Sequence, residues 1–501
     1  MRCDLGWGAR VLGDDPVRGR RCGNPQRRRS WIRNLRTASL ESGCGVCDRC
    51  PLDETVTTMR RLPLILLLLS GFAAMPAPAA EDVLALTRAD LARLESLAPG
   101  VTLELDGFPD GRGGSVTLHV EPMRVRAGGA RTLVVDARGE RELAPDRRRH
   151  LLGRSADGRL RAALWFGPGF TAAGGVGTGA GGETFVLEIR RDANGATLRA
   201  RPAEESLPAG VVPRIADGDD ALPSGRPLPD ALAVSLAPAI PAGAPRIATL
   251  AIDTDNEFMS ERFSNNTTAA SAWIDDLIAT MNVMYVSDLG VRLQRGTTIL
   301  RTTADPYVQT GSPAGSAHLN EFGGYWQANH GNVPRSFAML LSGKASSPNS
   351  SSGIAWVNSY CEYQSQGGSY SVNQVFRNPQ IPVIYSALLV AHELGHNFGA
   401  HHTHCTNVAT GGAPTGTNTI DRCHSGESGC YSGATSCPAP GGDTAGTIMS
   451  YCHNRGCGPD DQNLLQFHPT HVAALSVLVA QNTPSCLVVG SDVIFADGFE
   501  D

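Results

Sequence analysis

Four histidines and a glutamate stand within the stretch HELGHNFGAHH, which begins at His392, and three of these histidines have the spacing of metal ligands. His392 and His396 are four positions apart, so a helix would place both imidazoles on one face, where they can bind one metal ion. Gly399 can end that helix in a left-handed conformation, and the turn would bring His402 to the same ion. Three imidazoles leave the fourth position of a tetrahedral zinc open, as in catalytic sites. Glu393 could then take a proton from a water molecule at that position.

A helix is needed to present these side chains. The segment from Tyr385 to Ala391 contains good helix formers, and apolar residues continue at helical spacing up to Phe398. This pattern predicts a helix with one buried face that carries the first two histidines.

The motif resembles that of the metzincin metallopeptidases, whose pattern HExxHxxGxxH matches His392, Glu393, His396, Gly399 and His402. Within that clan, residues 246–487 look most like the reprolysin (adamalysin-type) family. The resemblance implies an α/β (α+β) catalytic domain, with a twisted mixed sheet and an active-site helix. It also implies one Zn²⁺ per chain and peptide-bond hydrolysis with Glu393 as the general base. The family spacing favours His402 over its neighbour His401 as the third ligand.

A second segment, GTIMSYC, supports the resemblance, because Met449 matches the methionine turn of metzincins. We expect Met449 to pack beneath the metal and not to bind it. The chain also departs from the adamalysins, which usually have Asp where Thr403 stands and Pro where Tyr451 stands. Astacins and serralysins have Tyr at the latter place. Two roles stay open for Tyr451: its phenol could bind the metal or stabilise an oxyanion, or its ring could only pack in the wall of the site. His404 and His424 are interpreted as ordinary loop histidines.

The composition is that of a globular protein with room for two or three domains. Of 501 residues, 18% are charged and 41% are hydrophobic, and the net charge is -6. The negative charge argues against a general nucleic-acid-binding protein.

A secretory signal peptide is predicted at residues 59–80. Met59 and two arginines precede a short apolar run, which is followed by small residues up to Ala80. The apolar run is too short to span a bilayer comfortably. We interpret residues 1–58 as an N-terminal extension that results from a mis-assigned start. The alternative is that Cys44-x-x-Cys47-x-x-Cys50 binds zinc or an iron–sulfur cluster.

The cysteines after the signal peptide are consistent with export. Eight of them follow residue 360, an even number that suggests up to four disulfides. By resemblance to the family, Cys361 pairs with Cys486. The pairing of the other six is open, and they are Cys405, Cys423, Cys430, Cys437, Cys452 and Cys457.

Residues 81–202 are expected to form a β-rich domain in the place where metzincins carry a propeptide. Four runs alternate apolar and polar residues, namely Val101–Leu105, Ser115–Val120, Arg131–Val135 and Thr184–Ile189. This domain has no cysteine that could bind the zinc, so latency would need another ligand or steric blocking of the cleft. Residues 203–245 are rich in Pro, Ala and Gly and are interpreted as a linker that contains the maturation site. Residues 488–501 form a C-terminal tail.

The catalytic region is expected to alternate strands and helices. The predicted strands are Arg246–Asp253, Val291–Arg295, Phe337–Leu341 and Gly353–Val357, and the predicted helices are Ala269–Tyr285 and Thr470–Gln481. Gly353–Val357 resembles the edge strand that binds an extended peptide in this family, and a purely structural edge strand is the alternative. Asp253, Asp255 and Glu257 are interpreted as a solvated strand end, and calcium is not expected.

The sequence thus predicts a secreted, monomeric zinc endopeptidase that is made as a zymogen and acts on extended peptides or proteins. No membrane span or nucleic-acid partner is expected. One alternative is a non-catalytic surface or adhesion module that keeps the metzincin fold. Another is a protease whose only substrate is its own propeptide.

Overall fold

The computed structural model describes residues 83–179, 182–216, 221–225, 245–438, 446–454 and 465–490. The predicted N-terminal extension, the signal peptide, Cys457, most of the linker and nearly all of the tail lie outside the described residues. None of the helices in the described part of the chain is both long and apolar enough to cross a membrane.

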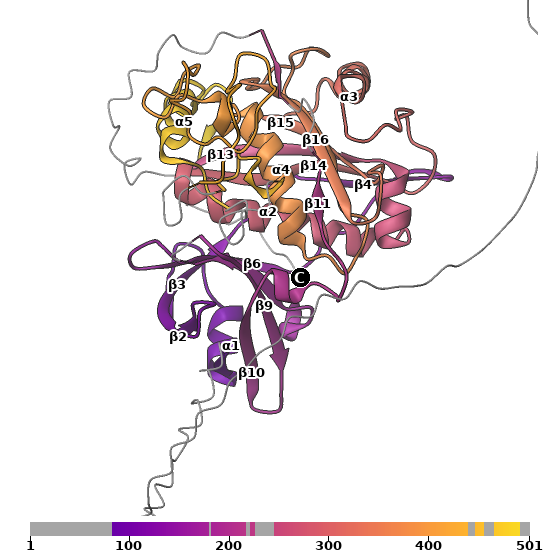
Figure 1. The fold of residues 1–501 in the computed structure, drawn as a ribbon. Helices are drawn as coiled ribbons and strands as arrows, with labels where there is room; N and C mark the ends of the chain where they lie inside the picture. The colour runs from indigo at the N-terminus through magenta and orange to yellow at the C-terminus, as the bar shows by residue number, and fades with distance from the viewer. Residues whose placement is uncertain are drawn as a thin grey trace, which may run out of the picture. The chain divides into compact units, whose positions relative to one another are not determined.

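The segment predicted to be rich in β-structure forms an antiparallel sheet of eight strands, in the order β1-β10-β9-β8-β7-β6-β3-β2 (Figure 1). Its strands are β1 (Val83–Thr87), β2 (Leu103–Pro109), β3 (Ser115–Met123), β6 (Arg149–Ser155), β7 (Arg161–Phe166), β8 (Gly174–Thr178), β9 (Thr184–Arg191) and β10 (Gly195–Pro202). Thr87 is the N-cap of helix α1 (Arg88–Glu95), because its side chain accepts a hydrogen bond from the Asp90 backbone N–H. Leu91 and Leu94 of this helix are buried in the core of the sheet.

The second sheet is mixed and contains ten strands, which fits the mixed α/β architecture predicted from the sequence. Its strands are β4 (Thr132–Asp136), β5 (Gly139–Glu142), β11 (Arg214–Ile215), β12 (Ala221–Pro223), β13 (Arg246–Thr254), β14 (Val291–Arg301), β15 (Phe337–Ser342), β16 (Ser350–Val357), β17 (Tyr370–Gln374) and β18 (Val488–Val489). The central strand β13 runs parallel to β14 and β15, and β17 continues this parallel arrangement. β16 is antiparallel to β17. β4 pairs with β14, so the N-terminal segment, residues 83–202, also contributes to this sheet.

Four helices cover the mixed sheet: α2 (Thr267–Leu289), α3 (Ser316–His330), α4 (Val383–Asn397) and α5 (Pro469–Gln481). Alternation along β13 separates the two faces. Leu250 and Ile252 belong to the core that contains α2, α4 and α5. Ala251, between them, belongs to the core beneath α3. Helix α4 is therefore packed against one face of the sheet.

The N-terminal segment also contacts helix α2. Arg126 forms an ion pair with Asp275, and Arg148 and Arg161 form ion pairs of 2.5 Å with Asp276 and Asp288. These three acidic residues of α2 are almost fully buried, and a buried carboxylate needs such partners.

The interpretation of Asp253, Asp255 and Glu257 as a solvated strand end was wrong for the first two, whereas the side chain of Glu257 is 37% exposed. Asp253 and Asp255 are fully buried. Both oxygens of Asp253 accept hydrogen bonds of 2.8 Å from Arg301, and Tyr307 and Trp326 also donate to this carboxylate. These donors come from segments far along the chain, which is why local sequence did not indicate them.

Candidate metal centre

Helix α4 carries His392, Glu393 and His396, and all three side chains are buried. The helix ends at Asn397, and Gly399 follows with a φ of +105°, a conformation that favours glycine. The Gly399 backbone donates to the carbonyl of His396 at 2.8 Å. This tight turn reverses the chain and brings His402 to the two helical histidines, as the spacing predicted.

The three imidazoles face one another through their Nε2 side. Each Nδ1 lies beside an acceptor: the Ile448 carbonyl at 2.7 Å for His392, the Ala400 carbonyl at 2.8 Å for His396 and the Glu427 carboxylate at 2.7 Å for His402. An acceptor at Nδ1 keeps the proton on that nitrogen, so Nε2 carries the lone pair. The arrangement therefore selects the tautomer that a metal ion requires.

The distances fit a zinc ion. The Nε2 atoms of His392 and His396 are 3.1 Å apart. Two nitrogen ligands of a tetrahedral zinc, each at about 2.0–2.1 Å, would be separated by about 3.3 Å. Ligand atoms of His392, His396 and His402 all lie within 4.8 Å of one another. His401, the competing ligand considered from the sequence, is not part of this group, and burial lowers the pKa of its imidazole.

Glu393 lies against strand β16. A Cβ atom added at Gly353 would come within 2.5 Å of the Glu393 Cγ and closer still to its carboxylate. The absence of a side chain at Gly353 thus gives the Glu393 carboxylate its place between α4 and the strand. The Glu393 side chain therefore faces strand β16.

Met449 packs against helix α4 and is fully buried. A Cβ atom at Gly395 would approach its sulfur to 2.7 Å, so the turn that carries Met449 contacts the helix between the two helical histidines. Thr403 connects this turn to the third histidine, because its backbone N–H and its hydroxyl donate to the Met449 carbonyl at 3.1 and 3.3 Å. The departure from the family at Thr403 therefore has a structural role.

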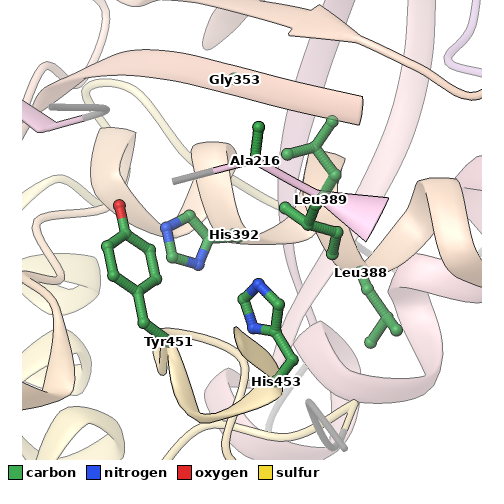
Figure 2. A pocket seen from close by; sticks show the side chains of 8 residues that line it. Ala216, Gly353, Leu388, Leu389, His392, Tyr451 and His453 are labelled. Atoms are coloured by element: carbon green, nitrogen blue, oxygen red, sulfur yellow. The ribbon is translucent and has the colours of Figure 1, made fainter. Parts of the chain in front are cut away.

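Tyr451 stands beside two of the histidines. Its ring is nearly parallel to that of His392 at 6.1 Å between centroids, and it lies 4.5 Å from that of His402. Figure 2 shows Tyr451 and His392 next to each other in a pocket that His453 also lines. Both roles considered for Tyr451 remain compatible with this position.

A segment of the chain itself also lines the pocket. Ile215 and Ala216 lie there with Gly353, Leu388 and Leu389 (Figure 2). They belong to or directly follow β11, which pairs in parallel with β16, and β12 continues along the same strand. The Arg214 and Ala216 backbones donate to the carbonyls of Asn349 and Ser351 at 2.9 and 2.8 Å. The outer edge of β16 is therefore occupied by residues 214–216 and 221–223.

Sequence reasoning missed Glu427 and misinterpreted His404. The Glu427 Oε2 atom accepts from His402 at 2.7 Å and from His404 at 2.8 Å. Burial would raise the pKa of Glu427, but the two histidine hydrogen bonds outweigh it and lower the pKa. His404 is fully buried and is not an ordinary loop residue. No regular spacing links Glu427 to the motif, so no local signal could have identified it. His424 lies 4.8 Å from His404 between ring centroids.

Three disulfides have both cysteines within the described residues, and they hold the segments around the histidines. Cys361 is bonded to Cys486, the pairing that the family resemblance implied. The other two, which the sequence left open, are Cys405–Cys430 and Cys423–Cys452. Cys437 is also disulfide-bonded. The second and third bonds fix the loop after His402 and the turn after Met449.

Comparison with known proteins supports a peptidase. The family model Reprolysin_5, described as metallo-peptidase family M12, matches residues 244–466. The predicted resemblance to the reprolysin-like metzincins is thereby confirmed for this region. No curated protein matches the chain. Among solved structures, one entitled "Structure of a chaperone-substrate complex" matches with a TM-score of 0.28 and 12% identity, over 47% of this chain and 34% of that chain. The present match spans about a third of that structure's chain, and a likeness this low supports no conclusion.

Proposed function

We propose, from the premise that residues 244–466 are a reprolysin-like metallopeptidase region, that this protein is an exported zinc-dependent endopeptidase. The observation that carries the proposal is the convergence of His392, His396 and His402 beside the buried Glu393. Three neutral imidazoles fit a zinc site with an open position. The disulfides support export, since such bonds persist in oxidising compartments.

In the proposed reaction, zinc held by the three histidines would supply Lewis-acid polarisation and acidify a water molecule. Glu393 orients the attacking water, accepts its proton and then donates that proton to the leaving amine. Strand β16 orients the substrate, because an extended peptide can add to its outer edge through backbone hydrogen bonds. The three acceptors at the Nδ1 atoms keep the histidine rings fixed while the substrate binds.

Tyr451 is the second residue that we propose to assist catalysis. Its ring borders His392 and His402, so its phenol can reach a group bound next to the histidines. A phenol that donates to the developing oxyanion would lower the barrier. Tyr451→Phe would then reduce kcat while KM stayed close to that of the wild type.

Replacement of Glu393 tests the central proposal. Glu393→Gln should retain zinc and lose about 10²- to 10⁴-fold in kcat, because the general base is removed and the ligands are not. Casein digestion, with and without a chelator, and zinc content are the measurements. Glu261→Gln is the matched control, since Glu261 forms an ion pair with Arg377 outside the site. Full activity of Glu393→Gln would contradict the mechanism. If the wild-type protein does not digest casein, the result would favour the adhesion or self-processing alternatives.

We further propose that the chain is made as a zymogen and that residues 214–216 and 221–223 block the substrate-binding edge. The hydrogen bonds from Arg214 and Ala216 to β16 are of the kind a bound peptide would make. Ala216 also lines the pocket with His392. Steric blocking of this kind needs no cysteine in the propeptide.

This latency predicts a gain of activity. Ala216→Pro removes the donor to the Ser351 carbonyl, so the uncleaved chain should hydrolyse a short fluorogenic peptide about 3- to 10-fold faster, as expected from one lost hydrogen bond. Ile215→Pro is the matched control. In a pair of parallel strands, every second backbone N–H group points away from the partner strand. Because the N–H groups of Arg214 and Ala216 donate to β16, the N–H group of Ile215 points away from β16. Equal activity of Ala216→Pro and the wild type would argue against the blocking role.

A further inference from the structure

Glu427 bonds one of the three convergent histidines from a loop far from the motif. Its Oε2 atom accepts from the Nδ1 of His402 at 2.7 Å. The acceptors at the other two histidines, Ile448 and Ala400, are neutral backbone carbonyls. Of these three acceptors, Glu427 alone carries a charge. A carboxylate at Nδ1 makes the imidazole a stronger electron donor at Nε2 than a carbonyl does.

The surroundings of Glu427 hold its carboxylate in place. The same Oε2 atom accepts from the Nε2 of His404 at 2.8 Å. The His404 ring stacks on that of His402, with 5.2 Å between centroids and 7° between planes. The Cys405–Cys430 disulfide closes the loop that contains Glu427, and the Tyr431 backbone donates to the His404 carbonyl at 3.0 Å. The hydrogen bond from His404 and the disulfide that closes the loop thus hold the Glu427 carboxylate beside His402.

We propose that Glu427 is a positioning residue for the metal centre: it orients His402, fixes the tautomer with Nε2 toward the other two histidines, and increases zinc affinity through its negative charge. The proposal rests on the proposed function in that His402 is taken as a zinc ligand. His404 supports this arrangement, because its ring stacks on that of His402 and its Nε2 atom donates to the Glu427 carboxylate. The side chain of Glu427 is 24% exposed, so its substitution should leave the hydrophobic core intact.

Zinc affinity is the decisive measurement. Glu427→Gln removes the charge but keeps the shape, and the zinc dissociation constant of the full-length chain, measured by competition with a chromogenic chelator, should rise 10- to 100-fold. The melting temperature of the metal-free protein should change little. Activity should recover when zinc is raised to saturation, which a purely structural role would not produce. Glu261→Gln again serves as the control.

The outcomes separate this inference from the proposed function. Unchanged zinc affinity in Glu427→Gln, with normal affinity in the wild type and loss of zinc in His402→Ala, would overturn the role of Glu427 alone. Absence of zinc binding in the wild type would overturn the proposed function. Two zinc ions per wild-type chain, one of them lost in Glu427→Gln, would assign Glu427 as a ligand and overturn the positioning role.

If Glu427→Gln fails to fold, His404→Phe keeps a stacking ring and removes the second hydrogen bond to Glu427. It should then weaken zinc binding by less than the charge loss does, and unchanged affinity in that variant would count against the proposal.

Discussion

Gly353 of β16 limits where the Glu393 carboxylate can lie, and adding one methyl group there tests the proposed role of that carboxylate. In Gly353→Ala the new Cβ would lie 2.5 Å from the Glu393 Cγ. Ordinary carbon contacts are about 3.5–4.0 Å, so one of the two groups must move by about 1 Å. Gly353 is in a paired strand, opposite Asn373 of β17. The flexible Glu393 side chain is therefore the group expected to move.

The size of the effect follows from this displacement. A misplacement of about 1 Å in a reacting group costs about 10²-fold in rate, which corresponds to about 2.7 kcal/mol in the activation free energy. The three atoms nearest to the new methyl group all belong to Glu393 and not to a histidine, so zinc affinity should stay unchanged. Overpacking is expected to lower the free energy of unfolding by about 1–3 kcal/mol.

The assay compares kcat on a fluorogenic peptide, zinc content and thermal unfolding for Gly353→Ala. Gly324→Ala in α3 is the matched control, because a Cβ there would meet nothing within 4 Å. That control should keep full activity and gain about 0.4–1 kcal/mol in stability. Wild-type kcat in Gly353→Ala would refute the placement of Glu393 as the general base. Loss of zinc would show that the methyl group disturbs the histidines instead.

Two predictions concern stability. Asp255 is fully buried, and burial raises its pKa to about 7, so the folded chain holds a proton that the unfolded chain has lost. Stability should therefore fall by on the order of 4 kcal/mol as pH rises from about 4 to about 7. Asp255→Asn should flatten that part of the pH profile of chemical unfolding, and an unchanged slope would refute the assignment. Replacing Cys361 and Cys486 with Ser opens a loop of 125 residues and should cost about 5 kcal/mol, against about 3.5 kcal/mol for the 25-residue loop of Cys405–Cys430. Urea unfolding of the two double variants measures the order, and the reverse order would contradict the loop-length argument.

The features that the sequence predicted correctly are those that local spacing determines. Strand β13 was expected at Arg246–Asp253 and is observed at Arg246–Thr254, because a mostly apolar run fits a strand that is covered on both faces. Helix α4 was expected from the same kind of pattern, with a period near four. Contacts between distant segments could not be predicted in this way. Asp253 looked like an exposed strand end because its partners, Arg301 and Trp326, stand 48 and 73 positions away.

Residues 214–215 and 221–223 show a second reason why local sequence fails to predict structure. Their neighbourhood is rich in Pro, Ala and Gly, which predicts a linker and no regular structure. Two short strands nevertheless form there, β11 and β12, and both pair with β16. The backbone groups at the outer edge of β16 need hydrogen-bond partners, and this segment supplies them. Tertiary context, and not intrinsic propensity, explains why these strands exist.

Thr403 stands where adamalysins usually have an acidic residue, and this difference bears on the proposed role of Glu427. A single acidic residue directly after the third histidine, as adamalysins usually have, would place a carboxylate next to the ligand. In this chain the Thr403 hydroxyl binds the Met449 carbonyl instead and connects the third histidine to the methionine turn. The negative charge beside His402 comes from Glu427, 25 positions later, in a loop that the Cys405–Cys430 disulfide closes. Since no fixed spacing connects the two, only the folded arrangement identifies the carboxylate. Substitution of Thr403 should accordingly disturb the turn, and substitution of Glu427 should weaken the metal site.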